Sequence, residues 1–128
     1  FIAVLVDAEM TSGKLHVRRM VAAADLGAQP NPDIARQQIE GGLIFGLASA
    51  MGGAAHYKGG MPTRANLGRM GLPRLADIGE VTIELMPGEG APAGIGQIGV
   101  PAVAPALAGA LFTITGRRHR ALPLLTPE

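Results

Sequence analysis

The chain has 128 residues, no cysteine and a formal net charge of +1, which is enough length for one domain of ordinary size. The lack of cysteine excludes disulfides, zinc–thiolate sites and an iron–sulfur cluster held by this chain. The near-neutral charge gives no electrostatic reason to expect nucleic acid as a partner. Hydrophobic residues make up 48% and aromatic residues 3%, with 19 glycines and 10 prolines. We therefore expect a packed domain with many turns and close backbone approaches, and no membrane-spanning segment.

Two strands are predicted at the start of the chain. The run FIAVLVD (1–7) is continuously apolar, as in a buried strand, and a chain that opens inside such a run is expected to be a piece of a longer protein. AEMTSGK (8–14) supplies turn residues, and LHVRRMVAAAD (15–25) predicts a second strand, so a hairpin is the simplest connection. Arg19 breaks the alternation of this strand. The two expected faces are Leu15, Val17 and Val21 on one side, and His16 and Arg18 on the other.

A helix is predicted from Asn31 to about Met51. Asn31 is a good N-cap, Pro32 suits the first helical position, and Asp33 is favourable near the positive helix end. Apolar residues that recur every four positions predict the stripe that faces the core. They are Ala35, Ile39, Leu43, Leu47 and Met51.

Three glycines interrupt this helix at positions 41, 42 and 46. Each costs roughly 1 kcal/mol relative to alanine in a helix interior. Gln38, Gly42 and Gly46 fall on one line at i, i+4 and i+8, which predicts a nearly bare groove with one amide at its head. We expect either another helix or a cofactor to lie very close to the helix there.

The second half of the chain predicts less regular structure. Residues 52–79 contain many helix and strand breakers, with a short strand expected near 54–58. EVTIELM (80–86) alternates as a strand does, and a long loop follows it. A second helix rich in small residues is expected at about 101–115, ended by Gly116 and kinked or restarted by Pro105. These elements predict the α+β class, with mixed or antiparallel strands and two main helices.

The segment GIGQIG (94–99) matches the pattern G-x-G-x-x-G. In a dinucleotide-binding domain this pattern directly follows a strand, opens a helix and precedes an acidic residue about twenty positions on. Here Pro87 and Pro92 separate it from the predicted strand, and the region near position 119 is basic. The pattern alone therefore argues weakly for a dinucleotide-binding domain, which we keep as the less favoured alternative.

The order of three longer motifs is more specific. They are AADLGAQPNPDIARQQIEGGLIFGLASAM (23–51), ANLGRMGLPRLADIGEVTIELMP (65–87) and APAGIGQIGVPAVAPALAGALFTITGRRHRALPL (91–124). This series resembles the C-terminal part of the molybdenum–pterin-binding large subunit of the xanthine dehydrogenase/aldehyde oxidase family, closest to the isoquinoline 1-oxidoreductase beta-subunit branch. The resemblance implies that residues 1–128 are the C-terminal segment of a larger molybdopterin-binding domain.

The same resemblance implies the activity and the partners. The family hydroxylates aldehydes and N-heterocycles with water as the oxygen source, using a molybdenum–pterin cofactor, as molybdopterin itself or in its cytosine dinucleotide form. The implied partners are the rest of the large subunit, an iron–sulfur subunit or domain that takes the electrons, and a small-molecule substrate. Alone, the chain is expected to be inactive and to bind no cofactor. Cytoplasmic and exported or periplasmic locations both stay open.

Residue roles follow from the motif matches. The glutamine of the family's Q-[IV]-E-G motif, beside the molybdenum–pterin group, matches Gln38. The family's G-x-G-E-P-G loop matches GIGQIG, with Ile95 and Gly96 as the backbone part beside the cofactor. The family's glutamate, the general base of the reaction, is replaced here by Gln97. An amide cannot accept a proton usefully at neutral pH, so a family member that has lost catalysis and survives as a structural or partner-binding module is the main alternative.

The residues themselves also permit plainer roles. Gln38 could be a surface amide, Gln97 a turn residue, and the glycines could serve helix packing alone. Neither Glu40 nor Glu89 is an evident substitute base, and Arg74 with Asp77 predicts a structural ion pair. The three histidines lack metal-ligand spacing, so no metal is assigned to them.

Overall fold

The computed structural model describes residues 1–64 and 66–125. The strands and the two main helices are β1 (Ile2–Thr11), β2 (Lys14–Ala24), α1 (Pro32–Met51), β3 (Tyr57–Lys58), β4 (Met61–Pro62), β5 (Ile78–Leu85) and α2 (Val100–Thr115). Two short 3-10 turns lie at Leu67–Arg69 and Leu75–Asp77. The prediction of an α+β fold with two main helices is confirmed, and both helix ranges agree with the sequence to within one residue.

The main sheet has three strands in the order β1–β2–β5. β1 and β2 pair antiparallel through a tight turn at Ser12 and Gly13, both with positive φ, so β1 extends further into the expected turn region than predicted. β2 and β5 pair parallel, and α1 lies in the connection between them. The sheet is therefore mixed, one of the two arrangements expected.

The predicted facing of β2 is wrong for Val21, because this strand contains a bulge. Asp7 pairs with Arg19 and Ala8 with Val17, so Arg18 is one extra residue on the β2 side. The extra residue shifts the alternation, and Val21 lies on the outer face rather than beside Leu15 and Val17 as expected. The buried residues of β2 are Leu15, Val17, Met20, Ala22 and Ala24.

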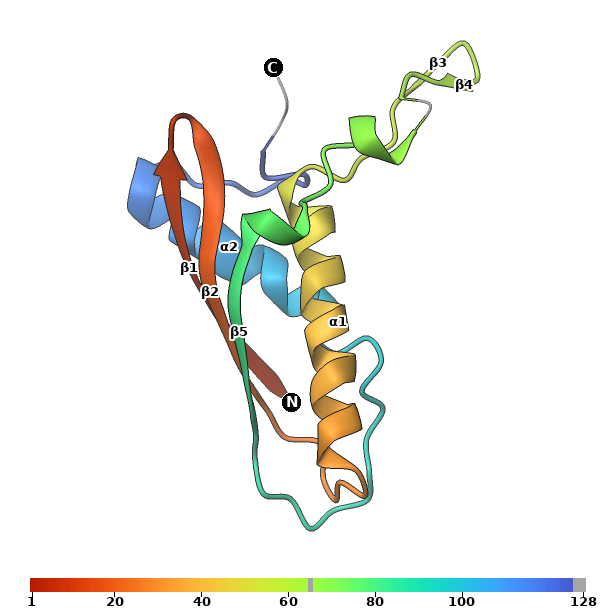
Figure 1. The fold of residues 1–128 in the computed structure, drawn as a ribbon, viewed down its shortest axis with the longest axis vertical. Helices are drawn as coiled ribbons and strands as arrows, with labels where there is room; N and C mark the ends of the chain where they lie inside the picture. The colour runs from red at the N-terminus through yellow and green to blue at the C-terminus, as the bar shows by residue number, and fades with distance from the viewer. Residues whose placement is uncertain (65, 126–128) are drawn as a thin grey trace.

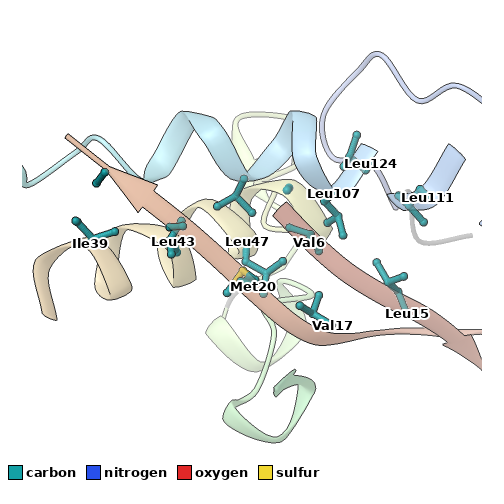
Figure 2. Packing of buried hydrophobic residues seen from close by; sticks show 14 of the residues in the cluster. Val6, Leu15, Val17, Met20, Ile39, Leu43, Leu47, Leu107, Leu111 and Leu124 are labelled. Carbon is teal, nitrogen blue, oxygen red and sulfur yellow. The ribbon is translucent and has the colours of Figure 1, made fainter. Parts of the chain in front are cut away.

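Both helices cover the same face of the sheet and close one hydrophobic core. Figure 2 shows Val6, Val17 and Met20 of the sheet facing side chains from α1 and α2. The fully buried side chains with the largest volumes are Met20, Leu26, Ile39, Leu43, Leu47, Leu107, Leu111 and Val103. Among the described residues no polar or charged side chain is buried. Charged groups therefore stabilise this core little, and apolar burial and packing hold it together.

Helix α1 begins as predicted. The Asn31 side chain accepts a hydrogen bond from the backbone N–H of Ile34 (3.1 Å), and Pro32 is the first helical residue. The predicted stripe is confirmed: Ala35, Ile39, Leu43 and Leu47 are buried, and Met51 packs partly buried against the core.

The start of α2 fills the predicted glycine groove. A Cβ on Gly46 would overlap the backbone carbonyl oxygen of Val100. From the other side, a Cβ on Gly99 would lie 3.1 Å from both the carbonyl oxygen of Ile39 and the backbone nitrogen of Leu43. The neighbour that the glycines require is thus another helix, packed backbone to backbone over Gly42 and Gly46.

The segment that carries β3 and β4 extends away from this core (Figure 1). The strand expected near 54–58 is only Tyr57–Lys58, paired with Met61–Pro62. The predicted ion pair between Arg74 and Asp77 does not form. The Asp77 carboxylate instead accepts a hydrogen bond from the backbone N–H of Arg74 (2.8 Å) and caps a 3-10 turn. Within the described ranges, no helix is long and apolar enough to cross a membrane.

The segment 94–99 has no place in a dinucleotide-binding unit. Among the described strands, the parallel crossover β2–α1–β5 carries its helix at Pro32–Met51, far from this segment in sequence. β5 ends at Leu85 and α2 begins at Val100, so residues 86–99 form a long loop, and Gly94 does not follow the strand directly.

We expect Gly46→Ala to lower the free energy of unfolding of the chain by about 1–3 kcal/mol, as overpacking does. Gly41→Ala is the matched control in the same helix, because nothing lies within 4 Å of its Cβ position. It should raise the stability by up to about 1 kcal/mol through helix propensity. Urea denaturation followed by circular dichroism measures both; equal losses for the two variants would contradict the packing contact.

We also expect no measurable binding of NAD or NADP, because the loop lacks a preceding strand and a ribose-binding acid. Calorimetric titration checks this expectation. A dissociation constant below about 100 μM, or about −5.5 kcal/mol, would restore the dinucleotide alternative.

Candidate functional site

One pocket brings together the polar residues that the motifs select. It has a volume of about 270 Å³ and lies between α1 and the start of α2. Its lining residues are Gln37, Gln38, Gly41, Gly42, Phe45, Gly96, Gln97 and Val100. Gln38 and Gln97 are far apart in the chain, so this meeting depends on the contact between the two helices.

The loop that carries Gln97 is held in place by backbone hydrogen bonds. The N–H of Ala28 donates to the carbonyl of Gly90 (2.8 Å), and the N–H of Ala93 donates to the carbonyl of Leu26 (2.9 Å). These bonds tie the loop to the connection between β2 and α1. At its far end the N–H of Val100 donates to the carbonyl of Gln97 (3.1 Å), which turns the chain into α2. The loop therefore reaches the pocket with both of its ends constrained.

The residues predicted for the site have different surroundings. Gln38 and Gln97 have exposed side chains and Gly96 is exposed, and all three line the pocket. Ile95 does not line it, because its half-buried side chain packs against the hydrophobic core. The predicted role of Ile95 belongs to its backbone and stays a prediction, as do the roles of the other three.

The pocket wall carries no charge of its own. None of its lining residues has a titratable side chain, and Glu40 and Glu89 lie outside it. Its polar groups are amides, which both donate and accept hydrogen bonds, and α2 begins at the pocket, so that its first turn adds positive partial charge. Across the described parts of the chain, no group of three histidine or acidic residues could hold a metal ion. The wall can orient a polar ligand, but it offers no base.

Four lining residues were not predicted for the site from the sequence: Gln37, Gly41, Phe45 and Val100. Three of them stand at i, i+4 and i+8 on α1, next to the line that was identified. That spacing was a usable signal. Val100 could be found only from the close contact with Gly46.

The arrangement fits a polar heterocyclic group that lies against bare backbone. Beside both Gly41 and Gly96, a Cβ would project into space with no heavy atom within 4 Å. Side chains there would fill the pocket, and glycine leaves it empty. The amides beside these glycines can pair with the ring nitrogens and carbonyls of a pterin.

Comparison with known proteins identifies the family of this chain. The family described as "Molybdopterin cofactor-binding domain" matches residues 1–79. A membrane-bound aldehyde dehydrogenase (pyrroloquinoline-quinone) of Gluconacetobacter polyoxogenes is 31% identical over 93% of this chain and 15% of its own length. The isoquinoline 1-oxidoreductase subunit beta of Brevundimonas diminuta is 31% identical over 86% of this chain and 14% of its own.

Solved structures share the fold. The aldehyde oxidoreductase of Desulfovibrio desulfuricans superposes with a TM-score of 0.76 and 27% identity, over 94% of this chain and 14% of that one. Quinoline 2-oxidoreductase of Pseudomonas putida gives a TM-score of 0.71 at 20% identity, over 83% and 14%. The chain thus spans about a seventh of the length of these relatives. On the family match and on the identity with both curated relatives, the chain belongs to the family of molybdopterin cofactor-binding domains.

Proposed function

We propose that this chain forms one wall of the molybdenum–pterin site in the large subunit of a hydroxylase that acts on aldehydes or N-heterocycles, with water as the oxygen source. The observation that carries the proposal is the pocket in which Gln38 and Gln97 meet over the glycine-lined surface of α1. The names of the relatives, which include an aldehyde dehydrogenase and an isoquinoline 1-oxidoreductase, support the two substrate classes.

We assign the cofactor contacts to this chain's own groups. Gln38 holds the pterin through its side-chain amide, and the backbone of Ile95 and Gly96 lies against the cofactor. When bound, the cofactor supplies a redox-active metal that takes two electrons from the substrate. Either molybdopterin itself or its cytosine dinucleotide form is compatible with this wall. An iron–sulfur subunit or domain is the proposed electron acceptor, since this chain has no cysteine to hold a cluster.

Residues 80–128 belong, in this proposal, to the same cofactor-binding unit as residues 1–79. Two contacts support this extension beyond the family match. Six of the seven residue pairs between β2 and β5 involve residues 80–85, and Val103, Leu107 and Leu111 of α2 are buried in the hydrophobic core. Without α2, the glycine groove of α1 and much of the core would be open to water.

Gln97 determines what this wall can do chemically. A positioned general base contributes typically 10²–10⁴-fold to a proton-transfer step. The Gln97 amide can hold a substrate or a water molecule by hydrogen bonds, but it cannot take the proton. We therefore propose that Gln97 makes hydroxylation slow. The alternative is a domain that has lost catalysis and serves as a structural or partner-binding module.

The chain purified alone is expected to contain no molybdenum. Only one wall of the pocket comes from these residues, which is too little to enclose a charged pterin cofactor. Elemental analysis of the purified chain checks this, and close to one molybdenum per chain would contradict it.

Gln97→Glu should raise the turnover of an aldehyde or an N-heterocycle at least tenfold, within the range that a general base contributes. The substitution keeps the side-chain length, and the positive end of α2 beside it favours the ionised carboxylate that can accept a proton. The measurement is the rate of anaerobic reduction of the metal centre by substrate, in the complete molybdenum-loaded enzyme, at equal molybdenum content.

Gln37→Glu serves as the positional control for this experiment. It adds the same carboxylate to the same pocket from α1, and it should not produce the increase if the position after Gly96 is what matters. A fast wild-type enzyme that Gln97→Glu slows would show that the proton goes to another group.

A further inference from the structure

The long loop before α2 is held against the connection between β2 and α1. The contact joins residues 26–29 to residues 86–93, and we call it the loop clasp. Two backbone hydrogen bonds cross it, one donated by Ala28 and one by Ala93. Leu26, whose carbonyl accepts the second bond, is buried in the hydrophobic core (2% exposed). The clasp therefore ties the loop to a segment that is itself anchored in the core.

Two glycines bring the backbones of the clasp into contact. A Cβ on Gly88 would lie 2.8 Å from the Cα of Gly27 and 3.0 Å from its carbonyl oxygen. From the other side, a Cβ on Gly27 would overlap the carbonyl oxygen of Ala91, and Gly27 has a φ of +69°, which L side chains rarely adopt. The neighbour is backbone in each case, so it cannot turn aside as a flexible side chain can. The clasp therefore requires glycine on both of its segments.

The clasp also determines where the Gln97 side chain lies. Its last hydrogen bond is donated by Ala93, and the next backbone bond of the loop joins the carbonyl of Gln97 to the N–H of Val100. Only three residues lie between Ala93 and Gln97, and two of them are glycines whose Cβ positions have no described heavy atom within 4 Å. The third, Ile95, packs partly buried against the core. A slip of one residue at the clasp would move position 97 by up to about 3.5 Å.

We infer that Gly27 and Gly88 are positioning residues for the side chain at position 97. They hold the loop in one register, so that this side chain lines the pocket together with Gln38. Register matters because a displacement of about 1 Å at a reacting centre can cost about a hundredfold in rate. The inference rests on the function proposed above, since it takes position 97 as the place of the base. It adds that this place is set by a contact outside the pocket, because neither glycine lines it.

Pairs of substitutions in the complete molybdenum-loaded enzyme separate position from stability. Gly88→Ala adds a methyl group inside the clasp. Gly90→Ala is the matched control in the same loop, because no described heavy atom lies within 4 Å of its Cβ position. Each is made alone and together with Gln97→Glu. Molybdenum content is measured first, and rates of anaerobic reduction by substrate are expressed per molybdenum, so that loss of loaded enzyme is not counted as loss of position.

We expect Gln97→Glu to keep its gain of at least about tenfold when it is combined with Gly90→Ala. Combined with Gly88→Ala, the gain should fall below about threefold, because the new carboxylate is then displaced from the reacting group. A merely structural glycine would lower the amount of loaded enzyme and leave the gain per molybdenum unchanged.

Amide hydrogen exchange followed by mass spectrometry tests the clasp without the reaction. In Gly88→Ala, the N–H groups of Ala28 and Ala93 should exchange at least about fivefold faster than in the wild type, because overpacking favours local opening. Gly90→Ala should leave both rates unchanged.

Gln29→Met is the milder variant for the case in which Gly88→Ala does not fold. It removes the hydrogen bond that the Gln29 side-chain amide donates to the carbonyl of Met86 (3.3 Å), and it adds no methyl group to the glycine contact. Both the exchange rates and the gain from Gln97→Glu should change in the same direction as in Gly88→Ala, by a smaller factor.

Two results would overturn the inference itself. A full gain from Gln97→Glu in the Gly88→Ala enzyme would show that the clasp does not place position 97. Equal exchange rates in Gly88→Ala, Gly90→Ala and the wild type would show that the glycine contact does not hold the clasp closed. By contrast, no gain from Gln97→Glu in the otherwise wild-type enzyme would overturn the proposed role of position 97, and the inference with it, even if the exchange rates change as expected.

Discussion

The contact between Gly46 and the start of α2 is the constraint on which the rest of the structure depends. It lets two helix backbones meet without side chains between them, because a Cβ on Gly46 would overlap the Val100 carbonyl oxygen. Gly99 makes the reciprocal approach to α1. This close packing buries Val103 and Leu107 against the sheet and, at the same time, puts Gln97 beside Gln38. The hydrophobic core and the pocket are thus two results of one contact.

The pocket that results separates binding from proton transfer. Its amides and bare backbone can hold a ligand in a fixed orientation, and they do so without any group that changes charge near neutral pH. An enzyme of this kind would depend on residues outside this wall, or on water, for its base. Because Gln97 lies at the positive end of α2, the same place would stabilise a carboxylate in its ionised form. The surroundings of position 97 therefore do not require a glutamine, because a carboxylate would also be stabilised there.

Much of the local structure could be predicted because its causes are local. Asn31 caps α1 through its own side chain, and the four-residue apolar repeat marks the buried stripe. Gln38 and Gln97 were selected by family motifs, and the described pocket brings them together. The bulge at Arg18 appeared in the sequence only as the break in alternation at Arg19, and that break did not reveal that one extra residue reverses the facing of every residue after it. The spacing did place Gly46, and not Gly41, on the line that meets a close neighbour, but it could not identify that neighbour as the start of a helix more than fifty residues further on.

The mixed sheet also sets an order of events during folding. β2 pairs with β1 across a two-residue turn, but it pairs with β5 at positions such as Val17 and Ile78, which are distant in the chain. Short loops close quickly, whereas long ones must first overcome a larger entropy of closure. The hairpin can therefore form early, whereas β5 must wait for α1 to cross over. Helix α2 packs on β1 and α1, so the surface on which it docks requires the hairpin and α1. The pocket wall is then complete only once α2 has docked, so a nascent chain lacks this wall until α2 has left the ribosome.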